Sequence, residues 1–268
     1  MVDLPADLDK AIEHALELSQ RTEGFLGEQE SRFLVILAAC TPAEGAIVEI
    51  GSFKGKSTIA LASVAARYGL GPVVAIDPHT APSPTDPDLA PGASSFDEFM
   101  AAIRDANLEK DVDAHRTFSR EVAKSWSRPI RLLWIDGEHT YKAAKEDFDL
   151  FSPYLSKGAI VALHDALHAF EGPIRVFVEE ILRSDRFGAA GFVQSLAWGQ
   201  FRPDDGAPFR AQREKLARKA ERLLPFLKDS QPLRGLAKIR YKLARSRVPR
   251  GPIAATEWLA QLSGKAAK

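Results

Sequence analysis

The sequence predicts an α/β fold, a doubly wound and mostly parallel sheet with helices on both faces. Short apolar runs typical of buried strands alternate along the chain with segments of helical apolar spacing. A turn that contains glycine joins the first of these strands to the helix after it, as happens at the carboxyl edge of a parallel sheet. Two helical patterns come before the first strand, and a helical extension follows the last one.

The expected elements can be justified in chain order. The second N-terminal helix is predicted from the apolar spacing of residues 27–40. Five runs rich in Val, Ile, Leu and Ala predict strands, namely 46–50, 72–77, 112–118, 130–136 and 158–165. Helices are expected between them, over 94–107 and starting near Gly55, Glu121 and Tyr141. A helix near residues 173–183 and one or two closing strands in 191–201 complete the predicted sheet.

Length and charge divide the chain into two parts. With 268 residues it can bury one full domain with an appendage, and we expect a catalytic domain over 1–205 and an extension over 206–268. The formal net charge is zero, yet residues 210–250 hold 14 Lys and Arg against three acidic residues, a net of +11. The first 209 residues carry a net of −12. The two parts therefore have different electrostatic surroundings.

The extension reads as basic amphipathic helices. One apolar face is expected from Leu216, Ala220, Leu223, Leu224 and Leu227, and a second from Leu233, Leu236, Ala237 and Leu243. Such a segment suits an anionic membrane surface. It equally suits packing on the acidic part or on a partner subunit, so a homo-oligomer stays open. Nucleic acid is disfavoured because few aromatic side chains are present to stack on bases.

The cysteine content and the hydropathy of the chain exclude several classes of protein. A single cysteine, Cys40, lies in an apolar helical pattern, so neither a disulfide framework nor a cysteine metal site is expected. The N-terminus lacks the basic start and apolar run of a secretion signal, and no stretch approaches the roughly 18 apolar residues of a membrane span. We therefore expect a cytoplasmic protein that can lie at the periphery of a membrane.

The first strand and its turn form the most informative motif, IVEIGSFKGKST over residues 47–58. A helix that begins where a strand ends points its unpaired N–H groups at a ligand. The dinucleotide fingerprint does not fit, because Phe53 and Lys56 stand where glycines are required. A phosphate-binding P-loop does not fit either, since only three residues separate Gly51 from Gly55.

The glycine pattern, with an acidic residue two positions before it, resembles motif I of class I S-adenosylmethionine-dependent methyltransferases. The resemblance implies a Rossmann-like fold and donor binding by Glu49, Gly51, Ser52, Asp77 and Ser119. Asp77 ends the second strand, where a carboxylate can accept both ribose hydroxyls; otherwise it is a turn residue before Pro78. Glu49 holds the turn or the amino group of the donor, or it bonds backbone N–H groups. Ser119 contacts the adenine edge or caps the helix expected at Glu121.

A second cluster follows the fourth and fifth strands, which end in WIDGEHTY and ALHDA. Because parallel strands end at one edge, we expect Asp136, His139, His164 and Asp165 to converge beside the donor site. Carboxylates and imidazoles that face an open cleft suit a divalent cation with free positions for substrate oxygens.

This pair of motifs resembles the metal-dependent O-methyltransferases, especially those that methylate sugar hydroxyls of macrolides. The resemblance implies a cation, Mg²⁺ or Mn²⁺, on Asp136, His164 and Asp165, with His139 as the catalytic base and Asp136 as a further catalytic residue. His164 departs from the carboxylate usual in metal-binding relatives, so a softer ion or no ion is an alternative.

The function expected from these motifs is methylation of a hydroxyl group on a small molecule or glycan, with S-adenosylmethionine as donor. Three alternatives stay open. They are a metal-independent methyltransferase with a histidine base, a P-loop-like nucleotide-binding protein, and a membrane adaptor without enzymatic activity.

Overall fold

The computed structural model describes residues 4–80, 93–227 and 233–264. Its centre is a seven-stranded sheet with the strand order β3-β2-β1-β4-β5-β7-β6. The strands are β1 (Ala46–Ile50), β2 (Val73–Ile76), β3 (Val112–His115), β4 (Ile130–Ile135), β5 (Leu155–Leu163), β6 (Phe187–Val193) and β7 (Leu196–Phe201). The first five are parallel, and β7 joins β5 and β6 in antiparallel pairs. One or two closing strands were expected within residues 191–201, and two are present, the first of which begins earlier, at Phe187.

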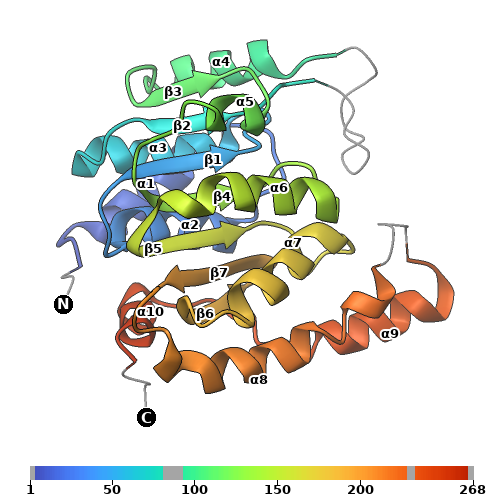
Figure 1. Ribbon diagram of the computed structural model, residues 1–268. Coiled ribbons are helices and arrows are strands. Elements are labelled where there is room, and N and C mark those ends of the chain that lie inside the picture. The colour runs from blue at the N-terminus through green and yellow to red at the C-terminus, as the bar shows by residue number, and fades with distance from the viewer. Residues whose placement is uncertain (1–3, 81–92, 228–232, 265–268) are drawn as a thin grey trace.

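Helices cover both faces of this sheet, as Figure 1 shows. One face carries α1 (Leu8–Ser19), α2 (Glu28–Cys40), α3 (Lys56–Tyr68), α4 (Phe96–Asp105) and α10 (Ala255–Leu262). The other carries α5 (Ser119–Ala123), α6 (Tyr141–Phe151), α7 (Glu171–Val176), a π-helical turn over Phe177–Leu182, and α8 (Arg210–Ala220). The helix α9 (Gly235–Arg245) lies beyond α8.

Alternating strand residues supply the two halves of the core. Val48 and Ile50 of β1 belong to the cluster under α6 and α7, whereas Ile47 belongs to the cluster under α2 and α3. The same alternation holds along β4, because Leu133 and Trp134 lie in opposite clusters. Since side chains of a strand alternate between faces, a run of apolar residues fills both layers at once. The doubly wound fold expected from the sequence is confirmed.

Several strands end one or two residues earlier than predicted. Asp77, Asp136, His164 and Asp165 all lie just after the last paired residue of their strands. Their side chains therefore lie at the carboxyl edge of the sheet, where parallel α/β proteins bind ligands. The helix expected at Glu121 also begins earlier, at Ser119, so Ser119 is its first residue and not its cap.

The basic extension packs on the rest of the chain. Leu216, Ala220, Leu223 and Leu227 are buried, as expected for the apolar face of α8 and the turn after it. In α9, however, Leu236 and Leu243 are exposed, and Tyr241 is the buried residue. Leu236 and Leu243 of the second expected apolar face therefore lie on the outer side of α9, and an aromatic side chain makes the contact with the rest of the chain. No helix in the described ranges is long and apolar enough to cross a bilayer.

Candidate active site

The turn after β1 presses against the end of β4. Gly51 has a φ of +89°, and a Cβ atom there would lie 2.2 Å from the carbonyl oxygen of Asp136. Gly55, with a φ of +94°, begins α3. Only glycine meets both demands at position 51, a left-handed backbone and close approach of a neighbouring chain. The turn and the end of β4 therefore form one rigid edge.

Asp77 holds this turn through its carboxylate. Oδ2 accepts hydrogen bonds from the backbone N–H groups of Ser52 (2.9 Å) and Phe53 (2.8 Å), and Oδ1 accepts one from His79 (2.6 Å). Phe53 and His79 both have a positive φ, and such backbone gathers at functional sites. Asp77 thus ties the end of β2 to the motif I turn, and its contact with a ribose stays a prediction.

Glu49 faces α3. Its two carboxyl oxygens each lie 2.5 Å from a hydroxyl group, that of Ser57 and that of Thr58. The side chain is fully buried, and burial raises its pKa to about 8, although the hydrogen bonds from Ser57 and Thr58 oppose this shift. Glu49 therefore holds the start of the helix that follows the turn. Its contact with the amino group of the donor stays a prediction.

Ser119 bonds to a neighbouring helix. Its hydroxyl donates to Oδ1 of Asp147 in α6 at 2.5 Å. Burial raises the pKa of Asp147 to about 6, and the Ser119 hydrogen bond opposes that shift. Adenine binding by Ser119 stays a prediction.

The four residues predicted to converge after β4 and β5 do so. His164 Nδ1 lies 3.0 Å from Asp136 Oδ1 and 3.5 Å from Asp165 Oδ1. His139 Nε2 lies 3.5 Å from Asp165 Oδ2 and 3.7 Å from Asp136 Oδ1. The two carboxylates therefore separate the two imidazoles.

A fifth residue, Glu30 in the first turn of α2, completes the surroundings of His164. Its Oε2 lies 3.5 Å from Nε2 of His164, so both ring nitrogens of this histidine face carboxylates. Burial would lower the pKa of His164, whose side chain is only 2 % exposed, but Asp136, Glu30 and Asp165 raise it well above its usual value. His164 is thus a buried imidazolium.

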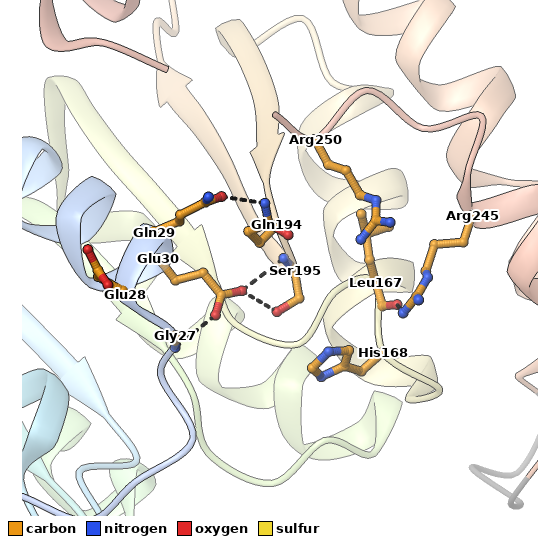
Figure 2. A pocket seen from close by; sticks show the side chains of 10 residues that line it. All are labelled: Gly27, Glu28, Gln29, Glu30, Leu167, His168, Gln194, Ser195, Arg245 and Arg250. Carbon is orange, nitrogen blue, oxygen red and sulfur yellow. Dashed lines mark hydrogen bonds between the residues drawn. The ribbon is translucent and has the colours of Figure 1, made fainter. Parts of the chain in front are cut away.

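Glu30 is itself held from three sides. The backbone N–H of Gly27 donates to Oε2 (3.1 Å), while the N–H (2.9 Å) and hydroxyl (2.5 Å) of Ser195 donate to Oε1, as Figure 2 shows. Burial would raise the pKa of Glu30, yet the hydrogen bond and charge of His164 together with Ser195 lower it to about 2. The pair is a buried ion pair whose remaining oxygen positions are satisfied.

Asp165 follows His164 in a left-handed turn, with a φ of +54°. Its Oδ1 lies 2.6 Å from Nδ1 of His168. Burial would raise the pKa of Asp165, but the hydrogen bond from His168 and the charges of the histidines around it hold the pKa below its usual range. Asp165 therefore stays ionised beside His139.

His139 lies on the wall of a cavity of about 360 Å³. Its ring stacks on Phe170, with centroids 4.5 Å apart and planes 15° from parallel. The same cavity is lined by the motif I turn, Gly51 to Lys54, and by Asp136, His164, Asp165 and His168. Phe25 and Leu26 close it from the segment before α2. The turn expected to hold the methyl donor and the expected base thus share one cavity.

The donor set does not fit the predicted cation as it stands. Nδ1 of His164 lies 3.0 Å from Asp136 Oδ1 and Nε2 lies 3.5 Å from Glu30 Oε2, so each nitrogen that could bind a metal ion already faces a carboxylate oxygen. Within the described ranges, no group of three or more His, Cys, Asp and Glu side chains is arranged to hold a metal ion. His164 instead places a positive charge among the three acidic side chains.

Glu30, Phe170 and Ser195 were not predicted as site residues. Glu30 and Ser195 are 165 positions apart in the sequence and meet only because the β6–β7 turn lies over the start of α2. The sequence signal for Glu30 is local, since a glutamate three residues after the N-cap, here Gly27, can accept a hydrogen bond from the N-cap N–H. That pattern indicates a helix start and says nothing about His164.

Comparison with known proteins agrees with this geometry. The family described as "Methyltransferase domain" matches residues 48–166, which include the motif I turn and all four convergent residues. Among solved structures, the O-methyltransferase NovP has a TM-score of 0.56 at 13 % identity, covering 72 % of this chain and 97 % of its own. The O-methyltransferase from Bacillus cereus in complex with SAH has a TM-score of 0.51 at 19 % identity, covering 72 % and 91 %.

A third solved structure, a putative O-methyltransferase from Klebsiella pneumoniae, has a TM-score of 0.52 at 16 % identity and covers 75 % of this chain and 92 % of its own. At these identities the likeness establishes the fold alone. Residues 48–166 match the methyltransferase domain family, so the chain contains a region similar to that domain on the fold of the class I methyltransferases.

Proposed function

We propose that this enzyme methylates a hydroxyl group of a small molecule or glycan, with His139 as the general base. The observation that carries the proposal is the shared cavity, because His139 and the motif I turn line it together. Methyl transfer from a sulfonium is an in-line displacement, and an alcohol becomes a good nucleophile only while it loses its proton. A base on the same cavity as the donor supplies that step.

The groups around His139 support this role. Asp136 and Asp165 lie within 3.7 Å of its Nε2, and both can stabilise the imidazolium that forms when the ring takes the proton. Phe170 holds the plane of the ring by stacking. Asp136 and Asp165 thus act on the charge of the base, and Phe170 acts on its orientation.

We favour the metal-independent form of this reaction over the cation expected from the resemblance. The His164 ring already lies between Glu30, Asp136 and Asp165, with its nitrogens 3.0 to 3.5 Å from their carboxylate oxygens. Proton transfer through His139 requires no resident ion. Asp136 and Asp165 remain the predicted ligands if a cation takes part.

The test is a thermal-shift and calorimetric screen of the full chain with S-adenosylmethionine, ATP and NAD, each with and without Mg²⁺ or Mn²⁺. We expect only S-adenosylmethionine and its demethylated product to bind, with an affinity that does not depend on exhaustive chelation. Binding of ATP without binding of the methyl donor would contradict the proposal. If chelation abolishes turnover and Mg²⁺ restores it, the cation takes part in the reaction.

A further inference from the structure

A second cavity, of about 460 Å³, lies next to the active site. It is formed by the start of α2, the loop after β5, the β6–β7 turn and the segment after α9, as Figure 2 shows. Its lining residues are Gly27, Glu28, Gln29, Glu30, Leu167, His168, Gln194, Ser195, Arg245 and Arg250.

The two cavities share residues. His168 and the region of Asp165 connect them, because His168 lines both cavities and its Nδ1 lies 2.6 Å from Asp165 Oδ1. On the opposite side, Glu30 contacts His164 in the active site and Ser195 in the second cavity. A molecule that placed one group beside His139 could therefore extend past His168 into this space.

Two arginines of the basic extension reach into the second cavity. Figure 2 shows Arg245 and Arg250 directed toward Leu167 and His168. Arg245 donates from Nη1 to the carbonyl oxygen of Leu167 at 3.2 Å, and both side chains are half-buried. Among the side chains that the structure describes, no carboxylate lies within 4.0 Å of either guanidinium. The cavity thus holds two positive charges that are not neutralised by this part of the chain.

The position of these arginines is set by packing. The Tyr241 hydroxyl of α9 lies 3.0 Å from the carbonyl oxygen of Leu167 and 2.6 Å from that of His168. The carbonyl of Arg250 accepts a hydrogen bond from the N–H of Gln194 at 2.9 Å. The extension is therefore tied at two points to the loops that form the cavity, so Arg245 and Arg250 are held in place before a ligand arrives.

The facing wall is polar. Gln194 Nε2 donates to Oε1 of Gln29 at 2.5 Å, which leaves the remaining amide groups of both side chains for a ligand. Glu28, at the start of α2, adds an acceptor on the same wall. Amides and a carboxylate are the groups that bind sugar hydroxyls. Two guanidinium groups match the oxygens of a phosphate and together balance the two charges of its dianion, whereas a carboxylate carries only one charge.

We propose that the methyl acceptor is a phosphate-bearing sugar, with its phosphate on Arg245 and Arg250 and its sugar hydroxyls along Gln29 and Gln194. This inference rests on the proposed hydroxyl methylation. The shared chemistry is a sugar joined to phosphate, which occurs both in soluble sugar phosphates and in lipid-linked glycans.

The experiment is calorimetry on the full chain saturated with the demethylated donor, with glucose 1-phosphate, glucose and glucuronate as probes. We expect glucose 1-phosphate to bind more tightly than the other two probes. Arg245→Gln and Arg250→Gln should each weaken that binding by about tenfold or more, because each removes one charge-assisted contact. Arg247→Gln, an exposed arginine of the same segment outside the cavity, should leave it unchanged.

The outcomes separate this inference from the function on which it rests. If the demethylated donor does not bind the wild type, the proposed function fails. A second result overturns the phosphate subsite alone. In that result the demethylated donor binds all variants with equal affinity, but glucose 1-phosphate binds no better than glucose, or glucuronate binds best. Equal donor binding in the variants also shows that they are folded.

A further arm separates the two sources of phosphate. Phosphatidylcholine vesicles with and without a polyprenyl monophosphate are added as competitors of glucose 1-phosphate. If vesicles with polyprenyl phosphate compete with glucose 1-phosphate, and Arg250→Gln abolishes this competition, the acceptor is lipid-linked. Retained binding of glucose 1-phosphate without competition supports a soluble one, and both outcomes uphold the subsite.

Discussion

His139 and His164 lie 25 positions apart and share two carboxylate neighbours, yet the structure gives them different surroundings. His164 is enclosed by Glu30, Asp136 and Asp165 and is held as a cation. His139 lies on the cavity wall against Phe170, where an acceptor can reach it. Environment, and not residue type, therefore assigns one histidine to charge compensation and the other to proton transfer.

The role of His139 as the general base can be tested by mutation. Replacement His139→Ala should lower kcat by about 10² to 10⁴, the usual contribution of a positioned base, because the acceptor keeps its proton. The dissociation constant of the demethylated donor, measured by calorimetry, should change little. The exposed His14→Ala serves as the control. Full turnover in His139→Ala would remove the residue from the mechanism.

Glu49 leads to a prediction about pH. Burial raises its pKa from 4.5 to about 8, so the folded state keeps a proton that the unfolded chain releases. This contribution to stability is fully present below pH 4.5 and is lost as the pH rises toward about 8. In Glu49→Gln the group cannot ionise, so the Tm of the variant should rise relative to wild type across that window.

Thermal unfolding of both proteins between pH 4.5 and 8.5 provides the measurement. The exposed Glu13→Gln accounts for the general effect of removing one carboxylate. Parallel curves of Tm against pH for wild type and Glu49→Gln would show that Glu49 is ionised in the folded protein.

At the scale of elements, α9 differs from α8. The buried face of α8 joins the core cluster through Leu216, Ala217 and Ala220, whereas α9 joins it through Tyr241, whose hydroxyl also bonds to the loop after β5. Its outer side exposes Leu236 (70 %), Ile239 (63 %) and Leu243 (57 %). Exposed Lys238, Arg240 and Lys242 lie between these apolar residues. An exposed apolar stripe with basic neighbours suits the interface of an anionic membrane.

We therefore predict binding of α9 to anionic vesicles. The full chain should sediment with phosphatidylglycerol vesicles at low salt and less at high salt, because each basic group near an anionic surface contributes up to about 1 kcal/mol that salt screens. Replacing Leu236, Ile239 and Leu243 together by Ser should abolish sedimentation. The same changes should leave the Tm unaltered, since the three side chains are exposed. Equal sedimentation of both proteins would refute this role of α9.

At the scale of the whole molecule, the acidic and basic parts of the chain form one structure. Arg213 of α8 is buried and donates to the carbonyl oxygens of Phe187 and Gly206. Trp258 of α10 is fully buried against Phe33 of α2 and Trp198 of β7. The packing alternative for the extension thus has direct structural support, and it does not exclude a membrane contact through α9.

This arrangement predicts that the extension is required for stability. A chain that ends at Pro208 should aggregate or unfold at a much lower Tm, because the core loses several large apolar side chains that each contribute about 1.5 to 3 kcal/mol. A chain that ends at Gly264 keeps α10 and serves as the control. An unchanged Tm and solubility of the chain ending at Pro208 would mean that residues 1–208 fold independently.

The sequence by itself determined the order of strands and helices, the motif I turn and the convergence of Asp136, His139, His164 and Asp165. Each of these depends on local pattern, since periodicity identifies the element and the end of a parallel strand places the side chain at the sheet edge. Glu49, Asp77 and Ser119 were located at that edge, but their hydrogen-bond partners could not be read from the sequence. Their roles toward the donor therefore stay predictions.

Only the tertiary structure decided what surrounds these residues. It brought Glu30 to His164 across 134 positions, and it brought Arg245 and Arg250 to the cavity beside His168. It also selected Tyr241 over Leu236 and Leu243 as the buried side of α9. Periodicity shows that a helix has an apolar side, but which surface that side meets depends on contacts between segments far apart in the chain. The charge state of His164 and the arginine cavity arise from such contacts.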